Sequence, residues 1–242
     1  MKIIPALVAA LTLLASSAHA DPFSDFQTRV RTDYVKPFAL DLGGVLGGAS
    51  AHTGRTLGMP GFWAGAVAAV QLRPDRDDRV LRDAGVKAFG VPLIEAGVGL
   101  PFKIDVIVHG MSAYGASIYG GGVRYGVYKT DLVDTFLPNV SLSVFGDKVN
   151  HKYFSATHAA ANAVATWNLP ILKPFFLAGF DVTEVKVGAA TTPGVAGTKA
   201  TARGSRFSVG ADVHPFPFLS LRGAYTLRHG LPGFDLGLGV QF

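Results

Sequence analysis

The sequence predicts an all-β fold, an antiparallel up-and-down β-barrel of about ten strands that follows an N-terminal, partly helical segment. Apolar and polar residues alternate along one segment after another, which is the periodicity of strands with two unlike faces. Only 16% of the 242 residues are charged, whereas about a quarter of a soluble domain is charged. The longest uncharged stretch after residue 20, residues 153–172, contains polar side chains and prolines, so it does not predict a bilayer-crossing helix. Together these observations predict a transmembrane barrel that crosses the bilayer with strands.

The first 20 residues have the pattern of a cleaved secretory signal peptide. Lys2 precedes an apolar run over residues 3–14, and small residues at Ala18 and Ala20 form the cleavage site. The run is too short to span a bilayer, and nothing after Ala20 continues it, which disfavours the alternative of a membrane anchor. The chain therefore divides into a signal peptide (1–20), an N-terminal segment (21–59) and the barrel (60–242).

The N-terminal segment does not alternate. Phe23, Phe26, Val30 and Tyr34 are spaced by three, four and four residues, which predicts a short amphipathic helix. Two glycine pairs follow within residues 43–48. Such a segment could sit in the barrel as a lumenal plug or extend as a periplasmic tail, and the pattern leaves both interpretations open.

Ten strands are expected in the barrel. The last is the clearest, because its even positions from Phe234 to Phe242 are apolar and its odd positions are polar or glycine. The alternation slips near Thr183, which suggests a bulge, and the run of glycines at 120–122 weakens the strand that contains it. The expected ranges are 62–72, 91–100, 104–112, 118–129, 140–149, 153–169, 176–187, 207–214, 219–228 and 234–242.

The ends of the strands give the barrel an orientation. An aromatic residue at the end of the last strand, Phe242, resembles the signal that the barrel assembly machinery reads, and it places this end in the periplasm. Proline-containing connections at 101–103, 130–139, 170–174 and 215–217 fall on that side, and the connections at 73–90, 110–115, 147–152, 188–203 and 229–232 fall outside. Aromatic residues at the periplasmic ends are expected to form a membrane-interface girdle that includes Trp63, Phe102, Trp167, Phe216 and Phe242, with Phe62, Phe136, Phe175 and Phe218 beside them.

Several motifs resemble a known group. Tyr34-x-x-Pro37 with Gly43-Gly44, then Pro60-Gly61-Phe62, residues 91–101 and residues 233–242 are similar to an uncharacterised family of bacterial outer-membrane barrels related to the long-chain fatty-acid transporter type. The resemblance covers nearly all of residues 21–242 and consists mostly of glycine, proline and aromatic positions. It implies a barrel with a lumenal N-terminal segment that passes small hydrophobic molecules. Those transporters have fourteen strands, however, and none of their ligand contacts maps onto this chain, so transport rests on analogy.

The polar faces of the strands are expected to line the interior. A charge that faces lipid costs about 2–4 kcal/mol near the bilayer midplane, so charged side chains belong inside. Arg228 should pair with Asp235 across a hairpin, and Glu95 should lie near His109. These groups are either structural pairs that fill a plugged interior or a polar path for a solute. The lumen-lining candidates are Glu95, Asp105, His109, Arg124, His158, Asp181, Asp212, Arg222, Arg228 and Asp235, with Asn162 and His214 on the same faces.

Several functional classes are disfavoured. The chain has no cysteine, which excludes disulfides and thiol chemistry, and its net charge of +5 is dispersed on an exported protein, so nucleic acid is not an expected partner. No histidine pair has metal-ligand spacing, and the acidic residues at 75–78 alternate with arginines, so neither a metal nor a cofactor is expected. No serine lies in a nucleophile setting, so the chain is not expected to be an enzyme.

The sequence thus favours a passive pore or transporter for small, hydrophobic molecules in the outer membrane of a Gram-negative bacterium. The alternative is a non-conducting structural or surface-binding barrel. A third interpretation, an outer-membrane hydrolase, would require His151 or His229 to lie beside a carboxylate and a serine. The expected partners are outer-membrane lipid and lipopolysaccharide, the assembly machinery through Phe242, and a small hydrophobic ligand.

Overall fold

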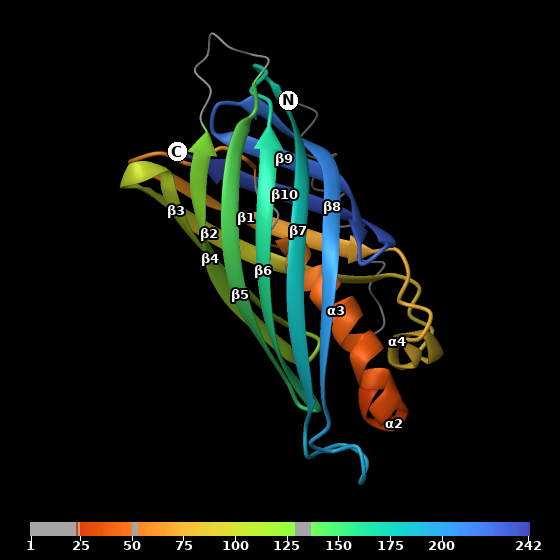
Figure 1. The fold of residues 1–242 in the computed structure, drawn as a ribbon. Coiled ribbons are helices and arrows are strands. Elements are labelled where there is room, and N and C mark those ends of the chain that lie inside the picture. The colour runs from red at the N-terminus through yellow and green to blue at the C-terminus, as the bar shows by residue number, and fades with distance from the viewer. Residues whose placement is uncertain (1–22, 24, 50–52, 129–136) are drawn as a thin grey trace, which may run out of the picture.

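Ten antiparallel strands form a closed barrel in which each strand pairs with its neighbours in sequence and β1 pairs with β10 (Figure 1). The computed structural model describes residues 23, 25–49, 53–128 and 137–242. The predicted fold class is confirmed. The predicted signal peptide with its cleavage site, most of the 130–139 connection and Phe136 lie outside the described residues.

Each predicted strand range overlaps one strand of the structure. The strands are β1 (Gly61–Gln71), β2 (Phe89–Leu100), β3 (Ile104–Ala113), β4 (Ala116–Tyr128), β5 (Asn139–His151), β6 (Phe154–Thr166), β7 (Leu172–Val187), β8 (Lys199–Phe216), β9 (Leu219–Arg228) and β10 (Leu231–Gln241). The helical elements are α2 (Phe26–Arg29), η1 (Thr32–Tyr34), α3 (Val35–Ala49), α4 (Arg79–Asp83) and η2 (Pro101–Lys103). None of the described helices is both long enough and apolar enough to cross a membrane.

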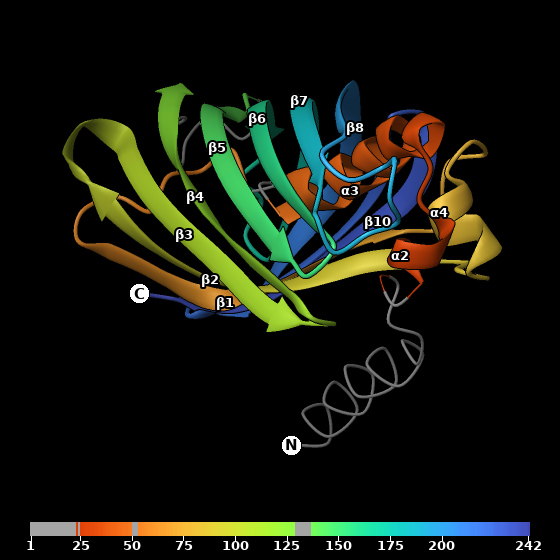
Figure 2. The ribbon, with the colours of Figure 1, turned by 90° about the horizontal axis from the view of Figure 1, so that it is seen from below.

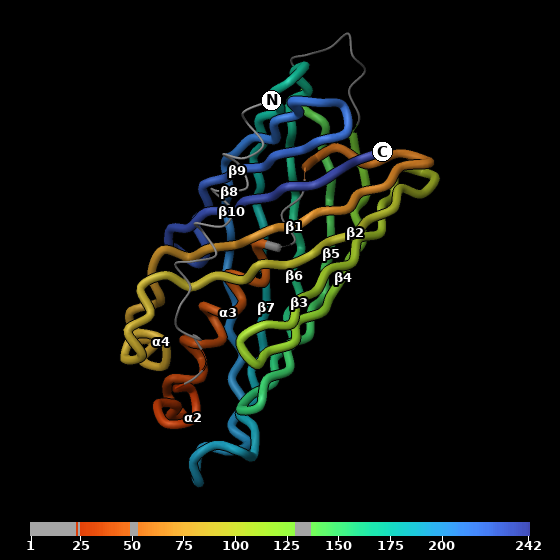
Figure 3. Tube along the Cα trace, turned by 180° about the vertical axis from the view of Figure 1, so that it is seen from behind, coloured from red at the N-terminus to blue at the C-terminus, as the bar shows by residue number. Residues whose placement is uncertain are grey.

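The two ends of the barrel differ. One end carries α2, α4 and the long hairpin of β7 and β8, and the opposite end carries the C-terminus (Figures 1 and 3). We call them the helix end and the Phe242 end. Strand β8 begins at Lys199, eight residues before the predicted start, so the last five residues of the predicted 188–203 loop belong to the sheet. The residues of this extension, 199–206, include lysine, arginine and glycine and show no apolar outer face, which concealed the strand.

The expected bulge near Thr183 is not there. Strand β7 keeps a continuous register with both neighbours through Thr183, and the register shifts lie instead between Gly126 and Tyr128 and between Val213 and Phe216. The apparent slip has another cause. Beyond Thr183 the inward positions become apolar and the outward positions become charged, because the outer face there meets water and the inner face packs against helices.

The glycine run does not interrupt β4, which pairs continuously with β3 and β5 through residues 120–122. Gly120 and Gly122 face the interior. A Cβ on Gly120 would overlap Asp147 and His109, and one on Gly122 would overlap the Phe145 ring. Glycine at these positions therefore makes room for large side chains from the neighbouring strands.

Helix α3 lies inside the barrel, so the N-terminal segment is a plug and not a tail (Figure 2). It enters at the helix end and packs against the inner faces of β8, β7 and β1. Its apolar residues join Phe23 and Phe26 with the inward side chains of Phe89, Phe154 and Val185 in one core. This core occupies the helix end, because there both the helix and the strand interiors are apolar.

The outer surface carries an apolar belt. Large hydrophobic side chains are exposed on the outward faces of nine of the ten strands, and β6 exposes alanines there; Ile94 (74%), Val144 (60%) and Val209 (59%) are among the most exposed. Other members of the belt are Val108, Tyr119, Val123, Tyr125, Leu142, Phe176, Phe180, Phe207, Tyr225, Leu227, Phe234 and Leu236. Toward the helix end the outward positions are instead charged or polar, as at Lys148, Glu184 and Lys186.

The predicted aromatic girdle is correct in part. Phe62, Phe102, Phe216, Phe218 and Phe242 are exposed at the Phe242 end, and the rings of Phe216 and Phe218 stack 5.8 Å apart. Trp167 is half-buried in the connection between β6 and β7.

Trp63 and Phe175 are corrections to that girdle, because both are buried inside the barrel. Each lies at one of the alternate positions of its strand whose side chains point into the barrel. The space for the indole comes from Gly239 on the neighbouring strand, where a Cβ would overlap the Trp63 ring.

Candidate functional site: the barrel interior

The structure places all ten lumen-lining candidates inside the barrel, where none is more than 9% exposed. Asn162 is buried with them, and His214 is half-buried. They form four groups, two of which contact α3. Burial of this many charges requires pairing, since an unpaired buried charge is strongly unfavourable.

The first group contains the predicted pair of Arg228 and Asp235. Arg228 donates to the Asp235 carboxylate and, through Nη1, to the Val70 carbonyl at 2.9 Å. The Thr226 hydroxyl donates to the other carboxylate oxygen. Gly48 of α3 packs on this group so closely that a Cβ there would overlap Asp235.

The second group joins the plug to the wall. The Asp181 carboxylate lies 2.9 Å from His229 Nε2 and 3.8 Å from Arg206 Nη1. His229 Nδ1 lies 3.0 Å from the Leu40 carbonyl of α3, so the ring can donate to both oxygens only when both of its nitrogens carry protons. A Cβ on Gly47 would overlap the Arg206 guanidinium. The glycines of α3 thus allow close approach to the buried charges of the wall.

His229 reaches this position through a two-residue turn between β9 and β10. His229 and Gly230 have φ values of 51° and 82°, the pair of positive values that a type I′ hairpin turn requires. The sequence placed His229 in an external loop, and the tight turn instead directs its ring inward. The His229 N–H bonds to the Ser205 carbonyl at 2.9 Å, which ties the turn to β8.

The third group is centred on Asp147, which accepts from two histidines. His158 Nδ1 lies 2.6 Å from Asp147 Oδ2, and His109 Nε2 contacts the other oxygen. Glu95 lies 4.0 Å from His109 Nδ1, so the expected proximity of Glu95 and His109 is present. Strands β2, β3, β5 and β6 each contribute one side chain to this group, and Gly120 of β4 makes room for it.

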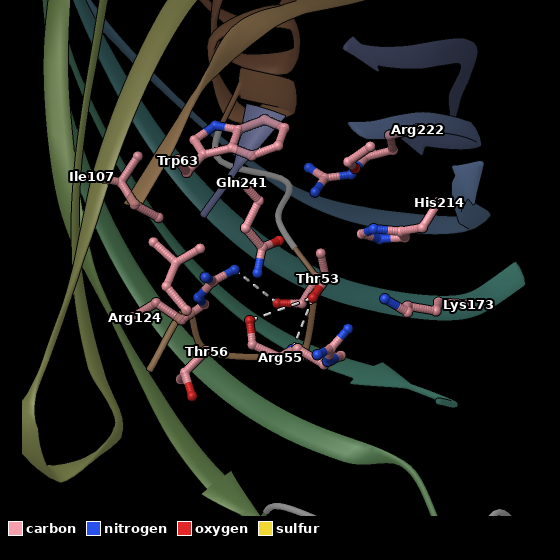
Figure 4. A pocket seen from close by; sticks show the side chains of 12 residues that line it. Thr53, Arg55, Thr56, Trp63, Ile107, Arg124, Lys173, His214, Arg222 and Gln241 are labelled. Atoms are coloured by element: carbon pink, nitrogen blue, oxygen red, sulfur yellow. Dashed lines mark hydrogen bonds between the residues drawn. The ribbon is translucent and has the colours of Figure 1, made fainter. Parts of the chain in front are cut away.

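The fourth group lies near the Phe242 end, below the plug. Arg124 pairs with Asp105 at 2.7 Å, and Arg222 pairs with Asp212 at 2.8 Å. Both arginines line a pocket with Arg55, Lys173 and residues of several strands (Figure 4). Arg124 also donates to the Thr53 carbonyl at 3.1 Å, which holds the segment after α3 against the wall.

Sequence reasoning missed Arg206, Asp147, Arg55 and Lys173. Arg206 lay one residue before the predicted start of its strand, and Asp147 was assigned to a loop although the predicted strand contained it. Parity was the available signal for both, because each is an even number of residues from polar positions on the same inward face. Arg55 lies in the non-alternating segment, where no sequence signal gives a direction.

At the helix end, two buried carboxyl groups connect the plug to the long β1–β2 loop. Asp41 of α3 accepts from Gln71 Nε2 at 2.6 Å and from the Asp75 N–H at 2.8 Å. Asp78 is the N-cap of α4 and accepts from the Leu81 N–H at 3.1 Å. The expectation of a solvated, self-paired loop holds for Asp77 with Arg76 but is wrong for Asp78, which is fully buried.

The buried carboxyl groups of Asp41 and Asp78 also interact electrostatically with each other. Burial, and then the negative charge of Asp41, raise the pKa of Asp78 to about 8. Burial likewise raises the pKa of Asp41. Protonation of Asp78 therefore favours the contact between plug and loop.

No protein-family profile and no curated protein sequence matches this chain. Among solved structures, the chain is similar to the translocator domain of the autotransporter NalP from Neisseria meningitidis, with 11% identity, a TM-score of 0.43 and coverage of 88% of this chain and 99% of that one. The N-terminal β-barrel domain of Pseudomonas aeruginosa OprF gives 12% identity, a TM-score of 0.37 and coverage of 74% and 97%. The outer membrane protein OprG from Pseudomonas aeruginosa gives 8% identity, a TM-score of 0.35 and coverage of 79% of this chain and 99% of that one. Likenesses at this level place the chain in no family, and the relation to the fatty-acid transporter type stays a prediction.

Proposed function

We propose that this chain is an outer-membrane β-barrel that its own α3 closes, and that it does not conduct while α3 is seated. The observation that carries the proposal is the bonding of α3 to the lumenal wall. Its Leu40 carbonyl contacts His229, and Asp41 accepts from Gln71 of β1. A pore for solutes, which the sequence favoured, would require these contacts to break.

The apolar belt supports the membrane location. Side chains such as Ile94 and Val144 are mostly exposed, and apolar residues, alanines in the case of β6, continue around the whole barrel instead of forming one patch. A soluble monomer seldom exposes a contiguous apolar area of this extent. Lipid would cover the belt, and the closed barrel leaves no strand edge unpaired in the bilayer.

The C-terminus supports the orientation. Phe242 and Phe62 exchange backbone hydrogen bonds of 3.0 and 2.8 Å at the seam where β1 meets β10, while the Phe242 side chain is 74% exposed. The ring is thus accessible for the assembly machinery before insertion. On this proposal the Phe242 end lies in the periplasm and the helix end lies outside the cell.

Lipopolysaccharide is the proposed neighbour of the outward face above the belt. Lys186 and Lys199 are cross-strand partners, and Arg203 follows on the same face of β8. Glu184 lies 3.8 Å from Lys199 and balances part of this charge. Like charges directly opposite each other destabilise a sheet, and lipid phosphates would relieve the repulsion.

We assign the barrel no catalytic role. Both ring nitrogens of His229 are engaged, one by Asp181 and the other by the Leu40 carbonyl, so neither is free to activate a serine. His151 accepts from the Tyr153 N–H at 3.3 Å and packs on Phe154. These contacts favour structural roles for the two histidines that the hydrolase interpretation needed.

Planar-bilayer recordings test the closed state. The full barrel should show no steady conductance, whereas deletion of residues 25–49 should give conducting insertions, because the polar lumen then lacks its plug. A steady conductance of the full barrel would contradict the proposal. A silent deletion variant that still shows the heat-modifiable mobility of a folded barrel would show that side chains of the wall, and not α3, close the lumen.

Single cysteines test the orientation, since the chain has no cysteine of its own. On intact cells a membrane-impermeant maleimide should label Lys152→Cys at the helix end and spare Lys103→Cys at the Phe242 end. After lysis both should react, because both positions are exposed. The opposite labelling would invert the proposed orientation, and labelling of both on intact cells would contradict the membrane location.

A further inference from the structure

A pocket opens inside the barrel near the Phe242 end, between the segment that follows α3 and the inner faces of the strands (Figure 4). Its volume is about 30 Å³. A water molecule needs roughly 10–15 Å³ on this measure, so the pocket has room for about two waters or one small polyatomic ion.

The lining of this pocket is strongly cationic. Arg55, Arg124, Lys173 and Arg222 all face it, together with the His214 ring (Figure 4). Asp105 and Asp212 balance Arg124 and Arg222 through direct ion pairs. Two further cationic side chains, Arg55 and Lys173, are left over.

Among the described residues, the Arg55 guanidinium and the Lys173 ammonium have no ion-pair or hydrogen-bond partner. Asp212 acts on both only from a longer distance and is already paired with Arg222. Lys173 is only 9% exposed, so water cannot fully solvate its charge. Two unpaired cations in a half-enclosed pocket repel each other and are stabilised by an anion between them.

The donors suit one chemical class of anion. Arginine presents a planar fork of N–H groups that matches phosphate and carboxylate oxygens, and lysine is a compact point charge that phosphate also accepts. The Ser220 hydroxyl and the Gln241 side chain line the same pocket and can add neutral hydrogen bonds.

We propose that this pocket is a binding site for a phosphate group, held mainly by Arg55 and Lys173. The group arrives either as free phosphate or as the headgroup of an anionic lipid at that end of the barrel. The site is independent of whether the barrel conducts, because the pocket lies below α3 and uses none of its contacts with the wall.

Isothermal titration of the folded barrel in a non-ionic detergent tests the site. Inorganic phosphate should bind with one site per barrel, and Arg55→Gln or Lys173→Gln should each weaken binding at least about tenfold, since a hydrogen bond to a charged group contributes about 1.5–3 kcal/mol. The matched controls Arg76→Gln and Lys152→Gln remove the same charge from exposed loops and should leave binding unchanged.

A second titration with a short-chain phosphatidylglycerol distinguishes the source of the phosphate. Binding of the lipid without binding of free phosphate, lost in the Arg55 and Lys173 variants, would assign the site to a headgroup. Binding of neither by the natural chain, or equal loss in the pocket and control variants, would overturn the proposal.

Thermal unfolding provides a readout that does not require the variants to bind. In phosphate-free buffer of low ionic strength, Arg55→Gln should leave the barrel as stable as the natural chain or more stable, because it removes a repulsion. In phosphate the natural chain should gain stability and the variant should not, so the order of the two reverses. A variant that is less stable in both buffers to the same extent would show that Arg55 has only a structural role.

Discussion

The belt and the helix end of this barrel have opposite distributions of apolar and polar residues, although the same strands run through both. In the belt part of β7, Phe176 and Phe180 face outward and Asp181 faces the lumen. A few residues later Lys186 faces outward and Val185 is buried inside. The alternation of a strand therefore says that its faces differ, while the surroundings at each height decide which face is apolar.

The two sections are held together by different forces. At the helix end, water surrounds the outside and burial of aromatic side chains such as Phe26, Phe38 and Phe154 stabilises the fold, as in a soluble protein. In the belt, the lipid is as apolar as the side chains that face it, so burying those side chains against protein instead of lipid would add little stability. The interior there relies on buried ion pairs and hydrogen bonds. Four comparisons of matched variants can test this difference.

The largest effect is expected at Phe38, whose ring packs against those of Phe26 and Phe154 with centroids 5.0 and 5.1 Å away. Phe38→Ala should cost about 3–5 kcal/mol, measured by denaturant unfolding in detergent micelles. Phe180→Ala, which removes the same ring from the belt, should cost much less, because detergent fills the space. Equal losses would mean that one kind of core holds both sections.

A buried charge should matter nearly as much as a buried ring. Arg206→Met removes the cation beside the buried Asp181 carboxylate. The substitution should lower the free energy of unfolding by about 3–5 kcal/mol. Arg203→Met, three residues earlier on the exposed face of β8, should stay within about 0.5 kcal/mol. The same unfolding measurement applies. A small loss at Arg206 would show that Asp181 and His229 suffice without it.

On the outer face, the tolerance of one strand to a new positive charge should depend on whether the charge lies inside or beyond the belt. Val144→Lys puts a charge in the belt and should lower the stability of the inserted barrel by about 2–4 kcal/mol. Asn150→Lys, six residues along the same face of β5, should be tolerated. Folding yields into lipid vesicles give the comparison, and equal yields would place the boundary of the belt elsewhere.

The smallest effect is a pH dependence at the helix end. The pKa of Asp78 is raised to about 8 in the folded protein, so the folded state holds a proton that the unfolded chain releases above about pH 4. The stabilisation is therefore fully present below pH 4 and is lost as the pH rises through 8. The hydrogen-exchange protection factors of residues 72–88, which correct for the intrinsic pH dependence of exchange, should fall over that range.

Asp78→Asn is the control for this prediction. Asparagine caps a helix about as well as aspartate, and its amide can donate to Asp41 at any pH. The variant should therefore show nearly constant protection factors from pH 5 to 8, close to those of the natural chain in acid. Unchanged pH dependence in the variant would assign the titration to another group.

The strand ends predicted from the sequence are most accurate within the apolar belt. Strands such as β9 and β10, which lie mostly within it, were predicted within three residues at each end. Strand β8 was truncated because its first residues lie beyond the belt, where the inward positions contain small residues such as Ala202 and the outward ones are charged. Trp63 was misplaced because an aromatic residue at a strand end suits either a membrane interface or a lumen, and only the neighbouring Gly239 distinguishes them.

The cationic pocket near the Phe242 end was beyond sequence reasoning. Lys173 lies in a predicted turn, and Arg55 lies in a segment with no periodicity, yet closure of the barrel brings them to one pocket from positions more than a hundred residues apart.

By itself, the sequence determined the number of strands, the pairing of neighbours and the inward position of the charged residues, because a two-residue period and the cost of exposing charge to an apolar solvent are local properties. Only the tertiary structure decided where the N-terminal segment lies and what it touches. Helix α3 fits the lumen through close approaches at Gly47 and Gly48 to Arg206 and Asp235, side chains more than 150 residues away in the sequence. Such complementarity depends on the shape of the closed barrel, which no local pattern records.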